Sequence, residues 1–241
     1  MGIEQKRGVL FSAAPIDPQE PVEYVPVPGD YVVCADGGIG LAKRLGVRPD
    51  LIVGDFDSSQ DPACHPDPLF EGVPVLRVPR EKDDTDTKLA LSQLRREGCS
   101  LVLVFGGLGG RLDHTLANIA DLIYFRRRGM RVVLASDQNT LFVLENESVS
   151  LPQVQNRYLS LFSLTPCCKG VTLERVKYPL QNYTLTQEVP LGISNEFTPL
   201  GPAGIQVKEG FCLFAFPVIV EFRSPSRILF LLCVLFQDTM P

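Results

Sequence analysis

The chain has 241 residues, of which 45% are hydrophobic and 21% charged, a balance typical of a globular protein that buries a core. Its net charge of −5 at pH 7 argues against general nucleic-acid binding, which needs a basic face to neutralise phosphates. The most apolar stretch, RILFLLCVLF at 227–236, is far shorter than the about 20 residues that cross a bilayer as a helix. We therefore expect neither a nucleic-acid nor a membrane partner.

The first segment, MGIEQKRGVLF, lacks the apolar stretch and cleavage site of a secretory signal. The seven cysteines are irregularly spaced and include no CxxC pair. Reduced thiols in the cytosol are the ordinary interpretation of such a pattern. The sequence thus predicts a cytoplasmic protein.

Residues 1–145 alternate short apolar runs with amphipathic stretches. The runs, which predict strands buried on both faces, are Val9–Ala14, Tyr31–Ala35, Leu51–Val53, Val73–Val78, Leu101–Phe105 and Val132–Ala135. Helical periodicity follows in 87–96 and 115–127, where apolar residues recur on one side. Strands that alternate with helices predict an α/β domain with a mostly parallel sheet.

Beyond residue 145 the helical period disappears. Short segments rich in Thr, Val and Tyr, separated by Gly, Pro and Asn, predict an all-β sandwich or barrel over 146–216. Residues 217–241 form an atypical hydrophobic tail, for which a terminal strand, a docking segment and an abnormal chain end remain open.

Four acidic motifs each follow a predicted strand. Their members are Asp36 in ADGG, Asp55 and Asp57 in GDFDS, Asp83, Asp84 and Asp86 in KDDTD, and Asp113 in RLDH. Ligands of an open parallel sheet bind beyond the carboxyl ends of its strands, so these motifs are expected to converge on one crevice. Each Asp also has a simpler interpretation, because Asp86 and Asp113 could cap helices and the Asp55–Asp57 pair could shape a turn.

Convergent carboxylates need a compensating charge. Two of them about 4 Å apart repel by roughly 4 kcal/mol at an effective dielectric near 20, so a bound cation or raised pKa values must follow. Oxygen ligands without a His or Cys cluster favour Mg²⁺, Mn²⁺ or Ca²⁺ over zinc. Mg²⁺ shared with substrate phosphates is the usual arrangement in nucleotide sites.

The segment Gly106–Arg111 lies between a strand and a helix. Gly107, Gly109 and Gly110 let backbone N–H groups approach phosphates, and Arg111 offers a forked donor; a plain flexible turn is the alternative. Walker A and G-x-G-x-x-G motifs are both missing from the sequence. His114 is either a proton shuttle or a structural residue at the start of a helix.

These motifs, in this order, resemble those of the thiamine pyrophosphokinase family. The resemblance spans about residues 8–216, and in the second domain it includes KGVTLERVKYPLQN at 169–182 and PLGISNEF at 190–197. It implies an α/β domain followed by a β-sandwich, in a homodimer with its active site at the interface. The implied reaction transfers pyrophosphate from ATP to the hydroxyl of thiamine, giving thiamine diphosphate and AMP.

The resemblance also assigns roles to individual residues. Asp55, Asp57 and Asp86 would bind Mg²⁺, while Asp36 and Asp113 would complete the acidic site, either of them accepting the hydroxyl proton. Thr85, Arg111 and the glycines would lie near ATP. In the second domain Ser194 and Asn195 would contact thiamine, and Tyr178 would take the family's aromatic position.

Two rival functions are weighed against this one. The Asp55-x-Asp57 pair is also found in phosphatases with an aspartyl nucleophile, although those require Thr or Val where Ser58 stands. Alternatively, the first domain binds a nucleotide and the β domain acts as a sensor. The number of carboxylates favours an enzyme, because binding alone rarely needs so many.

Overall fold

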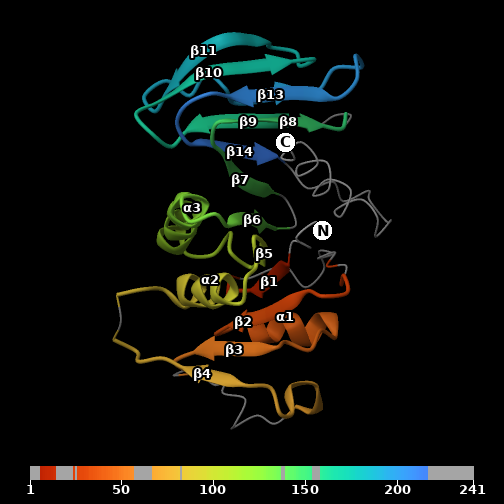
Figure 1. Cartoon of the computed structure of the whole chain (residues 1–241), viewed down its shortest axis with the longest axis vertical. Helices are drawn as coiled ribbons and strands as arrows, with labels where there is room; N and C mark the ends of the chain where they lie inside the picture. The colour runs from red at the N-terminus through yellow and green to blue at the C-terminus, as the bar shows by residue number, and fades with distance from the viewer. Residues whose placement is uncertain are drawn as a thin grey trace. The chain divides into compact units, whose positions relative to one another are not determined.

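The computed structural model describes residues 6–14, 24, 26–56, 67–81, 83–136, 139–153 and 158–216 (Figure 1). The chain divides into two compact units, Met1–Asp137 and Gln138–Pro241. Asp57 and the predicted tail at 217–241 lie outside the described residues.

Unit 1 is built on a parallel sheet. Its strands are β1 (Arg7–Phe11), β2 (Tyr31–Ala35), β3 (Leu51–Gly54), β4 (Val75–Arg77), β5 (Leu101–Phe105) and β6 (Arg131–Ala135). They lie in the order β6-β5-β1-β2-β3-β4, and each neighbouring pair is parallel. The central strands are continuous apolar runs because helices cover both faces of the sheet, which confirms the predicted α/β class.

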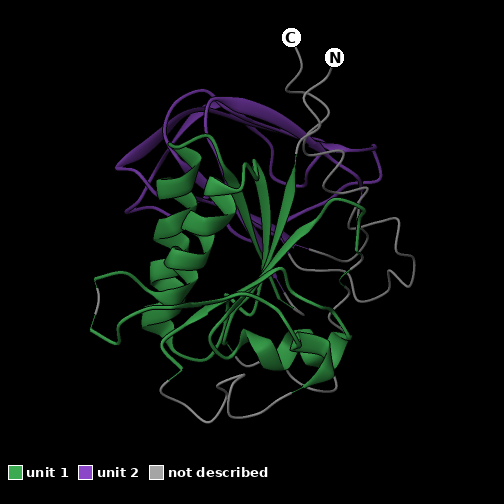
Figure 2. Cartoon of the chain, turned by 60° about the horizontal axis from the view of Figure 1, so that its bottom comes forward, with its two compact units in different colours: residues 1–137 green, residues 138–241 purple. Residues whose placement is uncertain are grey.

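The helices of unit 1 lie on the two faces of this sheet (Figure 2). They are α1 (Gly38–Leu45), α2 (Asp86–Arg96) and α3 (Leu112–Arg126), with a short 3-10 turn at Pro68–Phe70. The sequence predicted α2 and α3 to within a few residues. It did not predict α1, whose eight residues include two glycines and are too few for a clear helical period. None of the helices in the described ranges is long and apolar enough to span a membrane.

The order of the strands creates a switch point between β1 and β5. From β1 the chain moves through β2 and β3 to β4 on one side, then returns by α2 to β5 and moves on to β6 on the other side. At such a point the connections leave the sheet in opposite directions and open a crevice beyond the carboxyl ends of the strands. A ligand site is therefore expected beyond Phe11 and Phe105, the last residues of β1 and β5.

Unit 2 is entirely β-structure within its described residues. One sheet contains β8 (Glu147–Leu151), β10 (Cys167–Glu174), β11 (Leu180–Thr186) and β13 (Ala203–Val207); the other strands are β7 (Thr140–Leu144), β9 (Tyr158–Ser163), β12 (Asn195–Glu196) and β14 (Cys212–Phe216). Their pairings are antiparallel. Phe142 and Phe214 are fully buried, with ring centroids 5.0 Å apart. The predicted all-β second half is confirmed.

Candidate functional site

A pocket of about 360 Å³ lies at the switch point of unit 1. Its lining comes from the ends of β1, β2 and β5, from the first turn of α2 and from the first two turns of α3. The lining residues are Ser12, Ala13, Ala14, Ala35, Asp36, Thr85, Asp86, Thr87, Gly106, Gly107, Gly109, Gly110, Arg111, His114 and Asn118. A volume of this size suits a small-molecule ligand.

Asp36 enters this pocket from a strained backbone position. It follows β2 directly with a φ of 45°, in the left-handed region that Asp tolerates better than most residues. Its N–H group donates a 2.8 Å hydrogen bond to the carbonyl of Val53 on β3. Such conformations cluster at functional sites because the surrounding structure must hold them in place.

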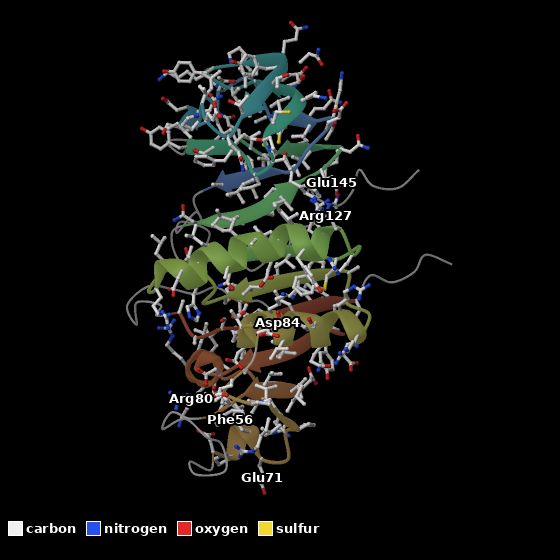
Figure 3. The ribbon with its side chains drawn as sticks, turned by 90° about the vertical axis from the view of Figure 1, so that its left-hand side faces the viewer. Phe56, Glu71, Arg80, Asp84, Arg127 and Glu145 are labelled. Carbon is white, nitrogen blue, oxygen red and sulfur yellow. The ribbon has the colours of Figure 1, made fainter. Side chains whose placement is uncertain are left out.

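The next strand end has a similar distortion. Phe56, labelled in Figure 3, has a φ of 53° and is buried beneath the guanidinium of Arg77, whose carbon lies 5.0 Å from the ring centroid. The preceding residue, Asp55, is half-buried but does not line the pocket. Asp57 lies outside the described residues, so the structure places only one member of that pair.

Thr85 and Asp86 begin helix α2 at the pocket wall. The Thr85 hydroxyl accepts a 3.1 Å hydrogen bond from the N–H of Lys88, so Thr85 is the N-cap and Asp86 the first helical residue. The simpler interpretation of Asp86 as a cap is therefore wrong, because the residue before it fills that position. The carboxylate of Asp86 remains in the first turn, where the helix dipole favours negative charge.

Asp84, also labelled in Figure 3, does not line the pocket and forms an ion pair instead. Its carboxylate lies 2.6 Å from the ammonium of Lys88. That contact raises the pKa of Lys88. The two side chains brace the start of α2 from outside the pocket.

The glycine segment after β5 packs closely against the backbone of Ser12, at the end of β1. A Cβ on Gly106 would come within 2.3 Å of the carbonyl oxygen of Ser12. Gly106, Gly109 and Gly110 all have positive φ values, 71°, 94° and 64°, which L-residues with side chains rarely adopt. The segment is therefore a fixed backbone curve that ends at the N-terminus of α3, an arrangement suited to an anion.

Arg111 and Asp113 form a forked ion pair at the start of α3. The Arg111 Nε and Nη2 atoms donate hydrogen bonds of 3.1 and 2.6 Å to the Asp113 carboxylate. This contact lowers the pKa of Asp113. Arg111 lines the pocket, whereas Asp113 is exposed and does not. Asp113 does not cap α3 either, since Arg111 is at the N-cap position.

In unit 2 the structure brings together the three residues to which the resemblance assigns roles, Tyr178, Ser194 and Asn195. The buried Asn195 side chain accepts a 2.9 Å hydrogen bond from the Tyr178 N–H and donates one of 2.7 Å to the Tyr178 carbonyl. Ser194, with a φ of 54°, donates its N–H to the hydroxyl of Ser160 at 3.1 Å. The Tyr178 ring is exposed, so a neighbouring molecule has access to it.

Three buried polar residues of the pocket, Ser12, Thr87 and Asn118, were not predicted as site residues from the sequence. Ser12 follows β1 directly and was included in the predicted strand, and Asn118 interrupts the apolar side of α3. Each bonds to a residue distant in the sequence: Ser12 to Thr87, and Asn118 to Gly107. A polar residue at the end of an apolar run, as at Ser12, or within the apolar side of a helix, as at Asn118, is the weak signal that sequence offers for such positions.

Both halves of the chain match known family models. Residues 28–134 match the thiamin pyrophosphokinase catalytic domain, and residues 146–212 match the thiamin pyrophosphokinase vitamin B1 binding domain. Thiamine pyrophosphokinase of Bacillus subtilis (strain 168) is 32% identical over 163 residues, which covers 67% of this chain and 75% of that protein.

Solved structures agree with the fold. A thiamin pyrophosphokinase family protein from Enterococcus faecalis is similar with a TM-score of 0.73 and 29% identity, covering 88% of this chain and 99% of that one. Thiamine pyrophosphokinase from Bacillus subtilis gives a TM-score of 0.75 at 23% identity, covering 89% and 100%. The second likeness is evidence for the fold alone.

Proposed function

This chain belongs to the thiamine pyrophosphokinase family, and from that premise we propose how its residues carry out the family's reaction. The chain is an enzyme that transfers pyrophosphate from ATP to the hydroxyl of thiamine, giving thiamine diphosphate and AMP. Unit 1 holds ATP in the pocket, and unit 2 contributes the contacts to thiamine.

One observation supports the ATP site above all others. A single pocket joins the glycine segment, the N-terminal turns of α2 and α3, and the carboxylates of Asp36 and Asp86. Helix N-termini and glycine N–H groups attract phosphates, and Arg111, whose fork is bonded to Asp113 in this structure, adds a positive charge at the pocket wall. The carboxylates would repel a bare triphosphate, which is why the site is suited to ATP that carries a divalent cation.

We propose Mg²⁺ as the cation, with Asp55, Asp57 and Asp86 as its ligands. Carboxylate oxygens are the donors that Mg²⁺ prefers, and this ion commonly needs only one or two carboxylates besides substrate phosphates. Among the described residues no group of three or more His, Cys, Asp or Glu could by itself hold a metal. When bound, the ion supplies charge neutralisation for the transferred phosphates.

Catalysis by the protein consists mainly of positioning and proton acceptance. The thiamine hydroxyl attacks the β-phosphorus, the bond from that phosphorus to the α-bridging oxygen breaks, and AMP leaves with the electron pair. Of the two proposed bases we favour Asp36, which lines the pocket. Asp113 is exposed and its pKa is lowered by Arg111, and a lower pKa makes a poorer base.

We further propose that the enzyme is a homodimer with its active site at the interface. The segment before Ser194 exposes Val189, Leu191 and Ile193 by 57%, 52% and 45%. Clustered apolar side chains of this kind are typical of a surface that a partner covers. Sedimentation of the purified chain tests the dimer, which a mass of one chain at micromolar concentration would contradict.

The cytosol is the compartment that we propose. Cys34, Cys99, Cys167, Cys168 and Cys212, the cysteines within the described residues, are all free thiols. Free thiols persist where glutathione and thioredoxin keep them reduced.

The reaction is tested by incubating the chain with ATP, Mg²⁺ and thiamine and separating the products by chromatography. We expect AMP and thiamine diphosphate in equal amounts, and neither of them after Mg²⁺ is chelated. Formation of ADP with thiamine monophosphate, or inorganic phosphate from ATP without a thiamine product, would contradict the proposal. A covalent phospho-enzyme trapped during turnover would instead support the aspartyl phosphatase.

A further inference from the structure

Ser12 belongs to none of the acidic or glycine motifs, yet the end of β1 contacts three of them. The Ser12 N–H donates a 2.8 Å hydrogen bond to the carbonyl of Phe105, which fixes it against β5. Its own carbonyl lies against Gly106, where a Cβ would come within 2.3 Å. The neighbouring carbonyl of Phe11 lies against Gly38, where a Cβ would come even closer, within 2.0 Å.

The Ser12 side chain makes the third contact, with helix α2. Its Oγ atom lies 2.7 Å from Oγ1 of Thr87, a residue 75 positions later in the chain. Both side chains are buried, each residue being 7% exposed. Thr87 is the second residue of α2 and follows Asp86 directly, so this hydrogen bond joins the sheet to the turn that carries a pocket carboxylate.

We propose that the Ser12–Thr87 hydroxyl pair is a positioning device that sets the first turn of α2 relative to the glycine segment. The inference rests on the proposed function, because it concerns where Asp86 and the first N–H groups of α2 meet the ATP phosphates and their cation. Ser12 is hydrogen-bonded to Phe105, the residue directly before the glycine segment. Its bond to Thr87 therefore fixes the position of α2 relative to that segment. Both residues act through Asp86.

If the pair only stabilised the fold, nucleotide affinity would follow thermal stability across the variants. The proposal predicts that the two measurements separate. Removing one hydroxyl leaves the other buried without its partner, which destabilises the fold, whereas replacing both by apolar groups of similar shape is nearly neutral. The double variant Ser12→Ala/Thr87→Val should therefore regain thermal stability. It still lacks the directional bond that fixes the first turn, so its affinity for the nucleotide should remain low.

The test measures stability and binding separately in the full chain. Binding of α,β-methylene-ATP, whose α,β bridge cannot be cleaved, is followed by calorimetry with Mg²⁺, and Tm by thermal unfolding. We expect about tenfold weaker binding for Ser12→Ala, for Thr87→Val and for the double variant, as is usual when a group that orients a metal ligand is lost. Thr87→Ser keeps the hydroxyl and should bind almost as the wild type does.

Ser163→Ala is the matched control. Ser163 is also 7% exposed, and its hydroxyl donates a 2.7 Å hydrogen bond to the carbonyl of Thr165 on the β-structured unit. This variant should lose stability and keep its nucleotide affinity. Wild-type affinity in the double variant, or affinities that follow Tm across all variants including Ser163→Ala, would overturn the inference. A wild-type chain that neither binds the analogue nor makes thiamine diphosphate would overturn the proposed function as well.

Discussion

The side-chain amide of Asn118 donates a 2.7 Å hydrogen bond to the carbonyl of Gly107, eleven residues earlier in the chain. Asn118 is 6% exposed and lies on α3. This hydrogen bond holds the glycine segment against α3, the helix that follows it. A Cβ on Gly107 would lie 3.0 Å from a side-chain carbon of Val104, a contact so close that Val104 would have to shift.

Asn118→Asp tests this relationship with almost no change in volume. An ionised carboxylate cannot donate to the Gly107 carbonyl, and the unsatisfied buried groups should lower the free energy of unfolding by about 1–3 kcal/mol. The new negative charge should also weaken ATP binding. Urea denaturation and calorimetry measure the two effects. Asn182→Asp, at an exposed position in unit 2, is the control and should change neither.

Gly106→Ala and Gly129→Ala form a second comparison. Both glycines have a positive φ, 71° and 78°, but a Cβ on Gly106 would meet the Ser12 carbonyl at 2.3 Å while one on Gly129 would meet nothing within 4 Å. Gly129→Ala should cost only the backbone strain, about 1–2 kcal/mol. Gly106→Ala should cost several times more or prevent folding. Equal losses in urea denaturation would show that the close approach at Gly106 has no energetic consequence.

Thr85→Ala tests the cap of α2. Loss of the hydroxyl that accepts from the Lys88 N–H should lower the free energy of unfolding by about 1 kcal/mol. Thr85→Ser keeps the acceptor and should restore most of that loss. If Thr85→Ala leaves stability unchanged while Asp86→Asn lowers it, the cap is Asp86, as the simpler sequence interpretation had it.

Asp121 makes stability depend on pH. Burial raises its pKa to about 6, against an opposing effect of Lys88. The folded chain therefore holds a proton that the unfolded chain releases at about pH 4. The stability that protonated Asp121 contributes is complete below that pH and is lost as the pH rises through about 6.

Asp121→Asn, which stays neutral, should accordingly be more stable than the wild type at pH 7.5, by a margin on the order of 2 kcal/mol. At pH 4 it should show no advantage. Denaturation curves at both pH values measure the difference. An advantage of the same size at pH 4 and pH 7.5 would mean that titration of Asp121 is not its source.

The strands of unit 1 could be predicted because helices cover both faces of the sheet, which makes β2, β5 and β6 continuous apolar runs. The rule that ligands bind beyond strand ends also correctly brought Asp36 and Asp86 to one pocket. The rule did not predict that Asp113 lies exposed outside the pocket. Its carboxylate is bound by the guanidinium of Arg111, a contact that the rule does not consider.

The remaining site residues could not have been found by local pattern. Ser12 and Asn118 are ordinary polar residues in apolar surroundings, and what distinguishes them is a hydrogen bond to a residue brought near by the fold. Helix α1 was missed for a related reason. Its start is fixed by the close approach of Gly38 to the Phe11 carbonyl, a tertiary contact that periodicity does not reveal.

The most direct test of the ATP site is the Mg²⁺ dependence of nucleotide affinity in the wild type and in Asp36→Asn/Asp86→Asn. Calorimetry with α,β-methylene-ATP, with Mg²⁺ and then with chelator, gives both values. Since the pocket carboxylates would repel a bare triphosphate, by roughly 4 kcal/mol for two charges about 4 Å apart, we expect chelation to weaken wild-type binding at least about tenfold. In the neutralised variant, which keeps Asp55 and Asp57, chelation should have a smaller effect than in the wild type. Wild-type affinity that is unchanged by chelator and by the loss of both carboxylates would contradict this site.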